Sequence, residues 1–143
     1  MIYGTDIVLL LLYVSEIKNN TFLQKEVFLA WKEVFPNKIA DLAFFPYYFG
    51  PYSDILTNIT DHLKKKKLIK KISISPKRFK YVITDLGKQI AKQRIDELDI
   101  DFDKLRNAKH NWEEFKGDGL MKYVYRNYPY YTSETKRPSL KWS

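Results

Sequence analysis

Between Phe49 and Gly87 the chain reads FGPYSDILTNITDHLKKKKLIKKISISPKRFKYVITDLG, and this stretch decides the fold. Gly50-Pro51 marks a turn, Pro51 suits the first turn of a helix, and Ser53 is an alternative N-cap. An amphipathic helix is predicted to run from there to about Lys66. Its apolar positions share one face, which must be the buried one: Tyr52, Ile55, Leu56, Ile59 and Leu63. The outward face then carries Asp54, Thr57, Asn58, Asp61, Lys64 and Lys65.

A β-hairpin and a further helix are predicted to follow. Residues 68–75 alternate loosely and are β-branched, residues 79–84 contain Tyr81, Val82 and Ile83, and Pro76-Lys77-Arg78 supplies the turn. Thr84-Asp85 can then cap a helix that runs to about Leu98. A helix followed by a basic hairpin and a return to helix is the order of a winged helix. We therefore predict a mainly α fold with a small antiparallel β-hairpin (α+β), namely a winged helix-turn-helix with extra C-terminal helices.

The residues before this stretch predict two or three helices. Thr5 or Asp6 can cap a first helix through about Lys18, and Thr21 can cap a second over residues 22–35. The apolar spacing of residues 38–43 indicates a short third helix. Residues 44–49 are aromatic-dense, and their proline leaves an edge strand or an extended arm.

The residues after it predict a helical and aromatic extension. Residues 102–115 and 120–127 have helical character, with a break at Gly117-Asp118-Gly119, and the tail over residues 128–143 is expected to be extended or frayed. We expect residues 1–98 to form the winged-helix domain. Residues 99–143 would pack on that domain or on a second subunit, because tyrosine clusters such as that of residues 123–131 are rarely left in water.

Composition limits the class of protein. A chain of 143 residues suits a single domain. The longest apolar run, residues 7–14, is far shorter than the roughly 20 residues that a membrane-spanning helix needs. No signal-peptide pattern and no cysteine is present, which predicts a cytoplasmic protein without membrane contact. The formal charge of +8 favours polyanionic partners.

Positive charge clusters on the predicted helix end and hairpin. Nine basic residues and no acidic one lie between Lys64 and Lys80. Each lysine or arginine that neutralises a DNA phosphate releases a counterion, so this cluster predicts nucleic-acid binding. Ser53, Thr57 and Asn58 could add hydroxyl or amide contacts to bases or phosphates. The predicted interface comprises Ser53, Thr57, Asn58, Lys64, Lys65, Lys67, Lys70, Lys77, Arg78 and Lys80.

Two alternatives to that interface stay open. The lysine run could be a solvated surface that maintains solubility. Asp54 and Asp61 lie on the same outward helix face, where phosphates would repel them unless they cap the helix, pair with lysines or accept from cytosine. The outward face could therefore meet a protein while the hairpin alone meets nucleic acid.

Patterns for metal, cofactor and catalytic sites are weak. Asp99, Asp101 and Asp103 have the spacing of a calcium loop, but Lys104 and His110 stand where that loop needs glycine and glutamate. His62 and His110 are far apart in the sequence, and no phosphate-binding glycine loop occurs. We therefore predict no metal, no cofactor and no enzymatic activity.

Two motifs resemble an uncharacterised family of archaeal and bacterial winged-helix proteins, in which a Leu-Gln-Lys helix start leads to a Phe-Gly-Pro-Tyr-Ser turn. The first motif is Leu23-Gln24-Lys25 with Phe28-Leu29, and the second is Phe49-Gly50-Pro51-Tyr52-Ser53. The similarity covers most of the chain and includes Leu56, Ile59, Leu63, Leu68-Ile69, Tyr81, Thr84, Gly87, Tyr123-Val124-Tyr125 and Tyr128-Pro129. The chain is more distantly similar to the Panacea-type antitoxin domains.

This resemblance implies a helical domain with a wing and a role in transcription regulation. It also implies that Gly50, Pro51 and Tyr52, with Ser53, fix the start of the third main helix. The leading hypothesis is a DNA-binding regulator that contacts duplex DNA through the helix and the wing, as a homodimer. The alternative from another class is a protein-interaction module, such as an antitoxin or an adaptor, with a protein partner in place of DNA.

Overall fold

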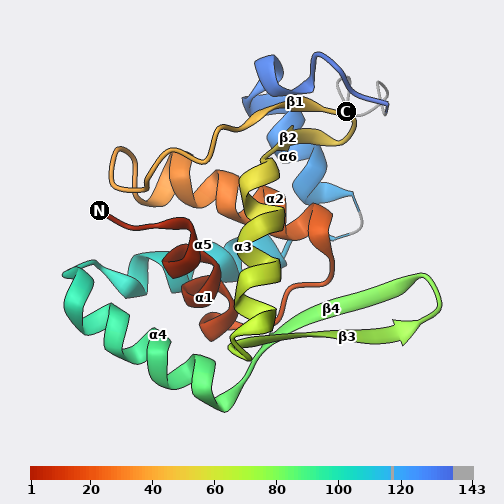
Figure 1. The fold of residues 1–143 in the computed structure, drawn as a ribbon. Coiled ribbons are helices and arrows are strands. Elements are labelled where there is room, and N and C mark those ends of the chain that lie inside the picture. The colour runs from red at the N-terminus through yellow and green to blue at the C-terminus, as the bar shows by residue number, and fades with distance from the viewer. Residues whose placement is uncertain (117, 137–143) are drawn as a thin grey trace.

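The computed structural model describes residues 1–116 and 118–136 and is mainly helical (Figure 1). Six α-helices lie in these residues: α1 (Gly4–Val14), α2 (Asn20–Leu29), α3 (Asp54–Lys65), α4 (Asp85–Leu98), α5 (Phe102–Glu113) and α6 (Gly119–Asn127). The structure also has two antiparallel β-hairpins. Before α3, β1 (Phe45–Tyr47) pairs with β2 (Gly50–Tyr52), and between α3 and α4, β3 (Ile69–Ser75) pairs with β4 (Arg78–Ile83). The coarse prediction of helices with a small hairpin is confirmed. None of the described helices is long and apolar enough to cross a membrane.

Helix α1 is the centre of the core. Its residues Ile7, Val8, Leu10 and Leu11 are fully buried, and it contacts α2, α3, α4, α5 and β4. The predicted continuation of this helix to Lys18 is wrong, because the backbone turns extended at Ser15, with φ at −169°. After Ser15 the main chain hydrogen-bonds to a strand that is distant in the sequence instead of continuing the helix.

That partner is strand β4. Ile17 donates its amide to the carbonyl of Tyr81 at 3.1 Å and accepts from the Tyr81 amide at 2.8 Å. The segment between α1 and α2 therefore lies beside β4 as a one-residue third strand, antiparallel to it. Residues 15–18 thus connect the helical core directly to the hairpin.

Helix α2 begins earlier than predicted. Asn19, not Thr21, is its N-cap, since the Asn19 side chain accepts from the amide of Phe22 at 3.0 Å. A π-helical turn, Ala30–Val34, extends the helix, so the predicted helical span is otherwise confirmed.

The predicted helix over residues 38–43 does not form. Ile39 instead pairs in parallel with Ile2, whose amide donates to Lys38 and whose carbonyl accepts from Ala40, both at 2.8 Å. Ile39 and Leu42 still reach the core, at 5% exposure each. An extended backbone thus buries these apolar side chains without a helix, because its main-chain groups bond to Ile2 near the N-terminus.

Helix α3 is confirmed, with two corrections. Ser53 is its N-cap and accepts from the amide of Leu56, whereas Pro51 lies in strand β2 instead of the first helical turn. The buried face consists of Leu56, Thr60 and Leu63, while Ile55 is 38% exposed. Thr60 can be buried because its hydroxyl donates to the carbonyl of Thr57 at 2.9 Å.

The second hairpin and the helices after it are placed as predicted. The turn is shorter by one residue, since Arg78 already belongs to β4, and Thr84 caps α4 by accepting from the amide of Gly87 at 3.0 Å. The prediction of an extended or frayed tail is wrong for Pro129–Thr132, which form a 3₁₀ turn. Residues 133–136 form turns and a bend, and the Lys136 amide donates to the carbonyl of Tyr48 at 2.8 Å. The part of that prediction over residues 137–143 lies outside the described residues.

Candidate functional site

The two motifs of the resemblance meet in space and hold each other. The Gln24 side chain donates to the carbonyl of Ser53 at 2.9 Å and accepts from the Ser53 amide at 2.8 Å. The ammonium of Lys25 donates to the carbonyl of Phe49. Both side chains are 1% exposed. The FGPYS loop, residues 49–53, is therefore anchored to α2 by buried polar contacts.

Lys25 is buried without a carboxylate partner among the described residues. Burial lowers its pKa to about 7. Gly50 lies beside it with φ at +99°, and a Cβ at this glycine would lie 3.3 Å from the Tyr125 ring and 3.7 Å from the Lys25 nitrogen. The loop geometry thus requires a residue without a side chain here.

Ser53, one of the residues predicted to contact DNA, lies inside the fold. Ser53 is fully buried, and its hydroxyl donates to the carbonyl of Leu42 at 2.5 Å. Its side chain is occupied inside the fold, so we leave it out of the interface proposed below. Tyr52 is half-buried, and its hydroxyl lies 3.3 Å from that of Thr57 on the exposed side of α3.

The basic hairpin surface consists of the lysines at the end of α3 and the basic residues of β3 and β4. The hairpin extends away from the helical body (Figure 1). Register pairs Lys70 with Val82 and Ile72 with Lys80 on one face, and Lys71 with Tyr81 on the other. The members of this surface are Lys64, Lys65, Lys66, Lys67, Lys70, Lys71, Lys77, Arg78 and Lys80.

Three members have partners within the protein. Lys64 pairs with Asp61 at 3.2 Å, Lys80 pairs with Glu16 at 3.1 Å, and the Lys71 ammonium lies 4.0 Å from the centre of the Phe79 ring. For the other six, no ion pair or hydrogen bond of the side chain is recorded in the described part of the chain, and all six are exposed: Lys65, Lys66, Lys67, Lys70, Lys77 and Arg78. This surface can therefore bind anions with little rearrangement.

The aspartates on the outward face of α3 have local roles. Asp61 is the partner of Lys64, and Asp54 lies in the first helical turn, where a negative charge is favoured by the helix dipole. Thr57 and Asn58 are exposed between them. Of the residues predicted to contact bases, these two are the ones that solvent can reach.

The tyrosine-rich block of residues 123–131 packs against this chain. Tyr123 and Tyr128 both donate their hydroxyls to Glu33, at 2.8 and 2.5 Å. Burial and this carboxylate raise the pKa of Tyr123 to about 12. The Tyr128 and Tyr131 rings lie edge-on to Phe28, with centroids 5.1 and 4.8 Å away.

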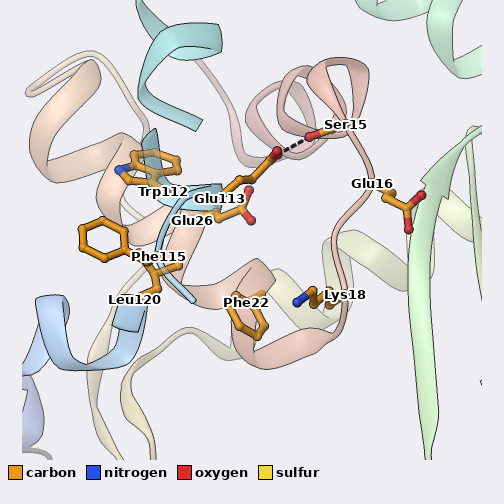
Figure 2. Close-up of a pocket in the computed structure, with 9 residues that line it drawn as sticks. All are labelled: Ser15, Glu16, Lys18, Phe22, Glu26, Trp112, Glu113, Phe115 and Leu120. Carbon is orange, nitrogen blue, oxygen red and sulfur yellow. Dashed lines mark hydrogen bonds between the residues drawn. The ribbon is translucent and has the colours of Figure 1, made fainter. Parts of the chain in front are cut away.

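A cavity of about 360 Å³ lies on another side of the core, beside residues 15–18 (Figure 2). Its walls come from that segment, from α2 and from the end of α5 with the start of α6. Buried Glu26 is one of its lining residues, and Lys109, a buried lysine outside the lining, has its Nζ 3.3 Å from Glu26 Oε1. The sequence patterns did not predict a role for Glu26 or Lys109, and they gave Gln24 and Lys25 only as part of the Leu-Gln-Lys motif, without their buried contacts. Glu26 had a signal in the sequence, because its helical neighbours three and four residues away are all apolar: Phe22, Leu23, Leu29 and Ala30.

No metal site is apparent in residues 1–116 and 118–136, since no group of three ligand-type side chains gathers there. Asp101 caps α5 by accepting from the amide of Lys104 at 3.2 Å, which gives one aspartate of the calcium-like spacing a local structural role. No family model, no curated protein and no solved structure matches this chain.

Proposed function

We propose that this protein binds double-stranded DNA through the basic hairpin surface and acts as a transcriptional regulator. The observation that carries the proposal is a projecting hairpin whose exposed lysines and arginine have no acidic partner in the described residues. A DNA duplex carries dense negative charge, and a projecting basic hairpin can follow a groove or the backbone beside it.

The order of elements supports a winged-helix mode of binding. The chain runs from α1 through a strand-like residue, Ile17, to α2 and α3, and then through β3 and β4. The Ile17 segment pairs with the second strand of the hairpin, as the first strand of a winged helix does with its wing. In this mode α3 lies against the major groove, and the turn at Pro76-Lys77 reaches the backbone or the minor groove.

The proposed contacts divide into two groups. The lysines and arginine would neutralise phosphates, with Lys64 and Lys80 exchanging their carboxylate partners for DNA. Thr57 and Asn58 are placed to reach base edges from the exposed face of α3, where an amide can pair with adenine. The phosphate group dominates affinity, and the second group would supply sequence preference.

The test is duplex affinity as a function of salt. Lys70→Ala, Lys77→Ala and Arg78→Ala together should weaken binding and reduce the slope of log K against log salt by about 0.9 for each phosphate that is no longer neutralised. Asn58→Ala should leave that slope unchanged and reduce discrimination among sequences.

The matched control removes the same charge elsewhere. Lys92, Lys104 and Lys122 are exposed on α4, α5 and α6, and their replacement by alanine should leave the salt slope nearly unchanged. Equal losses in the two triple variants would mean that net charge alone attracts DNA. Unchanged binding in the hairpin variant would remove the wing from the interface.

A protein-interaction module is the second candidate, and an exposed aromatic cluster favours it. Tyr47, Tyr48 and Phe49 are 38%, 41% and 45% exposed, and the rings of Tyr47 and Tyr48 stack with centroids 4.3 Å apart. Aromatic side chains are common at the centres of protein interfaces. Recovery of a stoichiometric protein and no nucleic acid with the native protein would favour this candidate.

We also propose a homodimer, because two copies would place two hairpins on successive half-sites of a duplex. Tyr128 and Tyr131, which contributed to this hypothesis, are used within the chain. Light scattering at high protein concentration decides the point, and a monomer mass there would remove the dimer.

A further inference from the structure

The cavity beside residues 15–18 has two chemically different sides (Figure 2). Phe22, Trp112, Phe115 and Leu120 supply an apolar, mostly aromatic side. Glu16, Glu26 and Glu113 supply carboxylates, against a single cationic lining residue, Lys18. In a protein with a formal charge of +8, this concavity has an excess of negative charge.

Glu26 is the buried acidic residue of this cavity. It is 5% exposed, and its atom Oε1 accepts no hydrogen bond from the described residues, although Lys109 Nζ lies 3.3 Å away. Lys109 directs its ammonium to main-chain carbonyls, those of Leu11 at 2.8 Å and Ser15 at 2.6 Å. Burial raises the pKa of Glu26 to about 7 despite this lysine. Glu26 is therefore a buried carboxylate in the cavity wall whose charge Lys109 offsets only in part, and a positively charged ligand beside it would be favoured.

The other acidic residues extend the same site to the surface. Glu113 is exposed and accepts from the Ser15 hydroxyl, and Figure 2 shows it beside Glu26. In the same lining, the rings of Phe22, Trp112 and Phe115 present surfaces that attract both apolar groups and cations. An anion would meet three carboxylates here, and a neutral apolar ligand would bring no charge to offset them.

We propose that this cavity binds a small organic cation, an ammonium or guanidinium group on an apolar body, with Glu26 and Glu113 as its anionic contacts. The apolar body packs against Trp112, Phe115 and Phe22. A volume of about 360 Å³ accommodates a ligand of the size of benzylammonium.

Such a ligand would also act on the hairpin, a consequence that rests on the proposed function. Glu16 lines the cavity and pairs with Lys80 of β4, and its neighbour Ile17 forms the two main-chain hydrogen bonds to Tyr81. A bound cation competes with Lys80 for Glu16 and displaces residues 15–18 from their contacts with the hairpin. The cavity is thus an effector site connected to the DNA-binding surface through one short segment.

The direct test is calorimetric titration with benzylammonium and phenylguanidinium, with benzyl alcohol and benzoate as neutral and anionic counterparts of the same size. We expect saturable binding of at least one cation, a change in the indole signal of Trp112, and no saturable binding of benzyl alcohol or benzoate. Failure of both cations, or equal affinity for benzyl alcohol, overturns the proposal.

Variants locate the ligand. Glu113→Gln should reduce cation affinity by about tenfold, because it replaces a charge-assisted hydrogen bond with a neutral one, and its exposed position keeps folding intact. Glu114→Gln, one residue further and outside the cavity lining, is the matched control and should leave affinity unchanged. Glu26→Gln should reduce affinity at least as much, and circular dichroism shows whether this buried variant folds. Unchanged affinity in Glu113→Gln overturns the assigned site.

The DNA arm is separate. Duplex affinity measured with saturating benzylammonium should change relative to the same concentration of sodium chloride, and Glu16→Gln should reduce that change. An unchanged duplex affinity overturns the coupling and leaves the cation site in place. Absence of all DNA binding refutes the proposed function, while the calorimetric result still decides the site.

Discussion

The FGPYS loop, with its anchors on α2, and the β3–β4 hairpin both depend on polar side chains, but in opposite ways. At the loop, Ser53 and the α2 residues Gln24 and Lys25 are buried, and each of these polar side chains has a partner inside the fold. On the hairpin, Lys70, Lys77 and Arg78 are exposed, and no ion pair or hydrogen bond of their side chains is recorded in the described residues. The Phe-Gly-Pro-Tyr-Ser motif and the basic cluster of the hairpin therefore have different roles in this protein. The first holds the fold together, and the second is available to a partner.

The largest effect is expected for the contact between Gln24 and the Ser53 main chain. Gln24→Leu removes both hydrogen bonds and leaves the Ser53 amide and carbonyl buried without partners, which costs about 3–4 kcal/mol of unfolding free energy. Urea denaturation measures it. The control is Gln93→Leu, since Gln93 is exposed and, within the described residues, its side chain bonds the exposed Glu97 side chain. Equal, small losses in both variants would show that the loop does not depend on this anchor.

The buried charge of Lys25 predicts a pH dependence of stability. Its pKa is about 7 in the folded protein and 10.5 when unfolded, so between these values the unfolded chain binds the additional proton. Stability should therefore rise with pH from 7 toward 10, by up to about 1.4 kcal/mol per pH unit from this group.

Lys25→Met, which keeps the volume and removes the charge, should flatten that rise. The measurement compares the denaturation midpoints of the two proteins between about pH 7 and pH 9. Lys109, whose pKa is also lowered by burial, contributes in the same direction to both proteins. Parallel pH profiles for the two proteins would mean that Lys25 stays charged inside the fold.

The hairpin could be predicted from sequence, whereas the anchoring of the loop could not. Alternation in β3, the turn at Pro76-Lys77 and the Thr84 cap are local signals, because each depends on residues that are close together in the sequence. The partners of Gln24 lie 29 residues away, and Ile39 became extended because Ile2 reached it from the far N-terminus. The cavity depends on α2, α5 and residues 15–18 together, so no window of sequence contains it.

The FGPYS loop and the basic hairpin surface each contain a residue with positive φ, and the expected stability effects there are smaller. Gly50 in the loop has φ at +99°, and Lys67 at the end of α3 has φ at +61°. Gly50→Ala should destabilise the protein by about 1–2 kcal/mol, while Lys67→Gly should stabilise it by up to about 1 kcal/mol. Thermal denaturation gives both values. A loss of stability in Lys67→Gly would show that the left-handed backbone at Lys67 is not strained.

The smallest stability effect is expected on the hairpin itself. Replacing Lys70, Lys77 and Arg78 with alanine removes three exposed charges that have no recorded ion pair in the described residues, so the unfolding free energy should change by less than about 0.5 kcal/mol. The same variant should lose the largest share of duplex affinity. If these replacements instead lowered stability as much as Gln24→Leu, the hairpin would be a structural element like the loop. The contrast between the two regions depends on stability and binding responding to different residues.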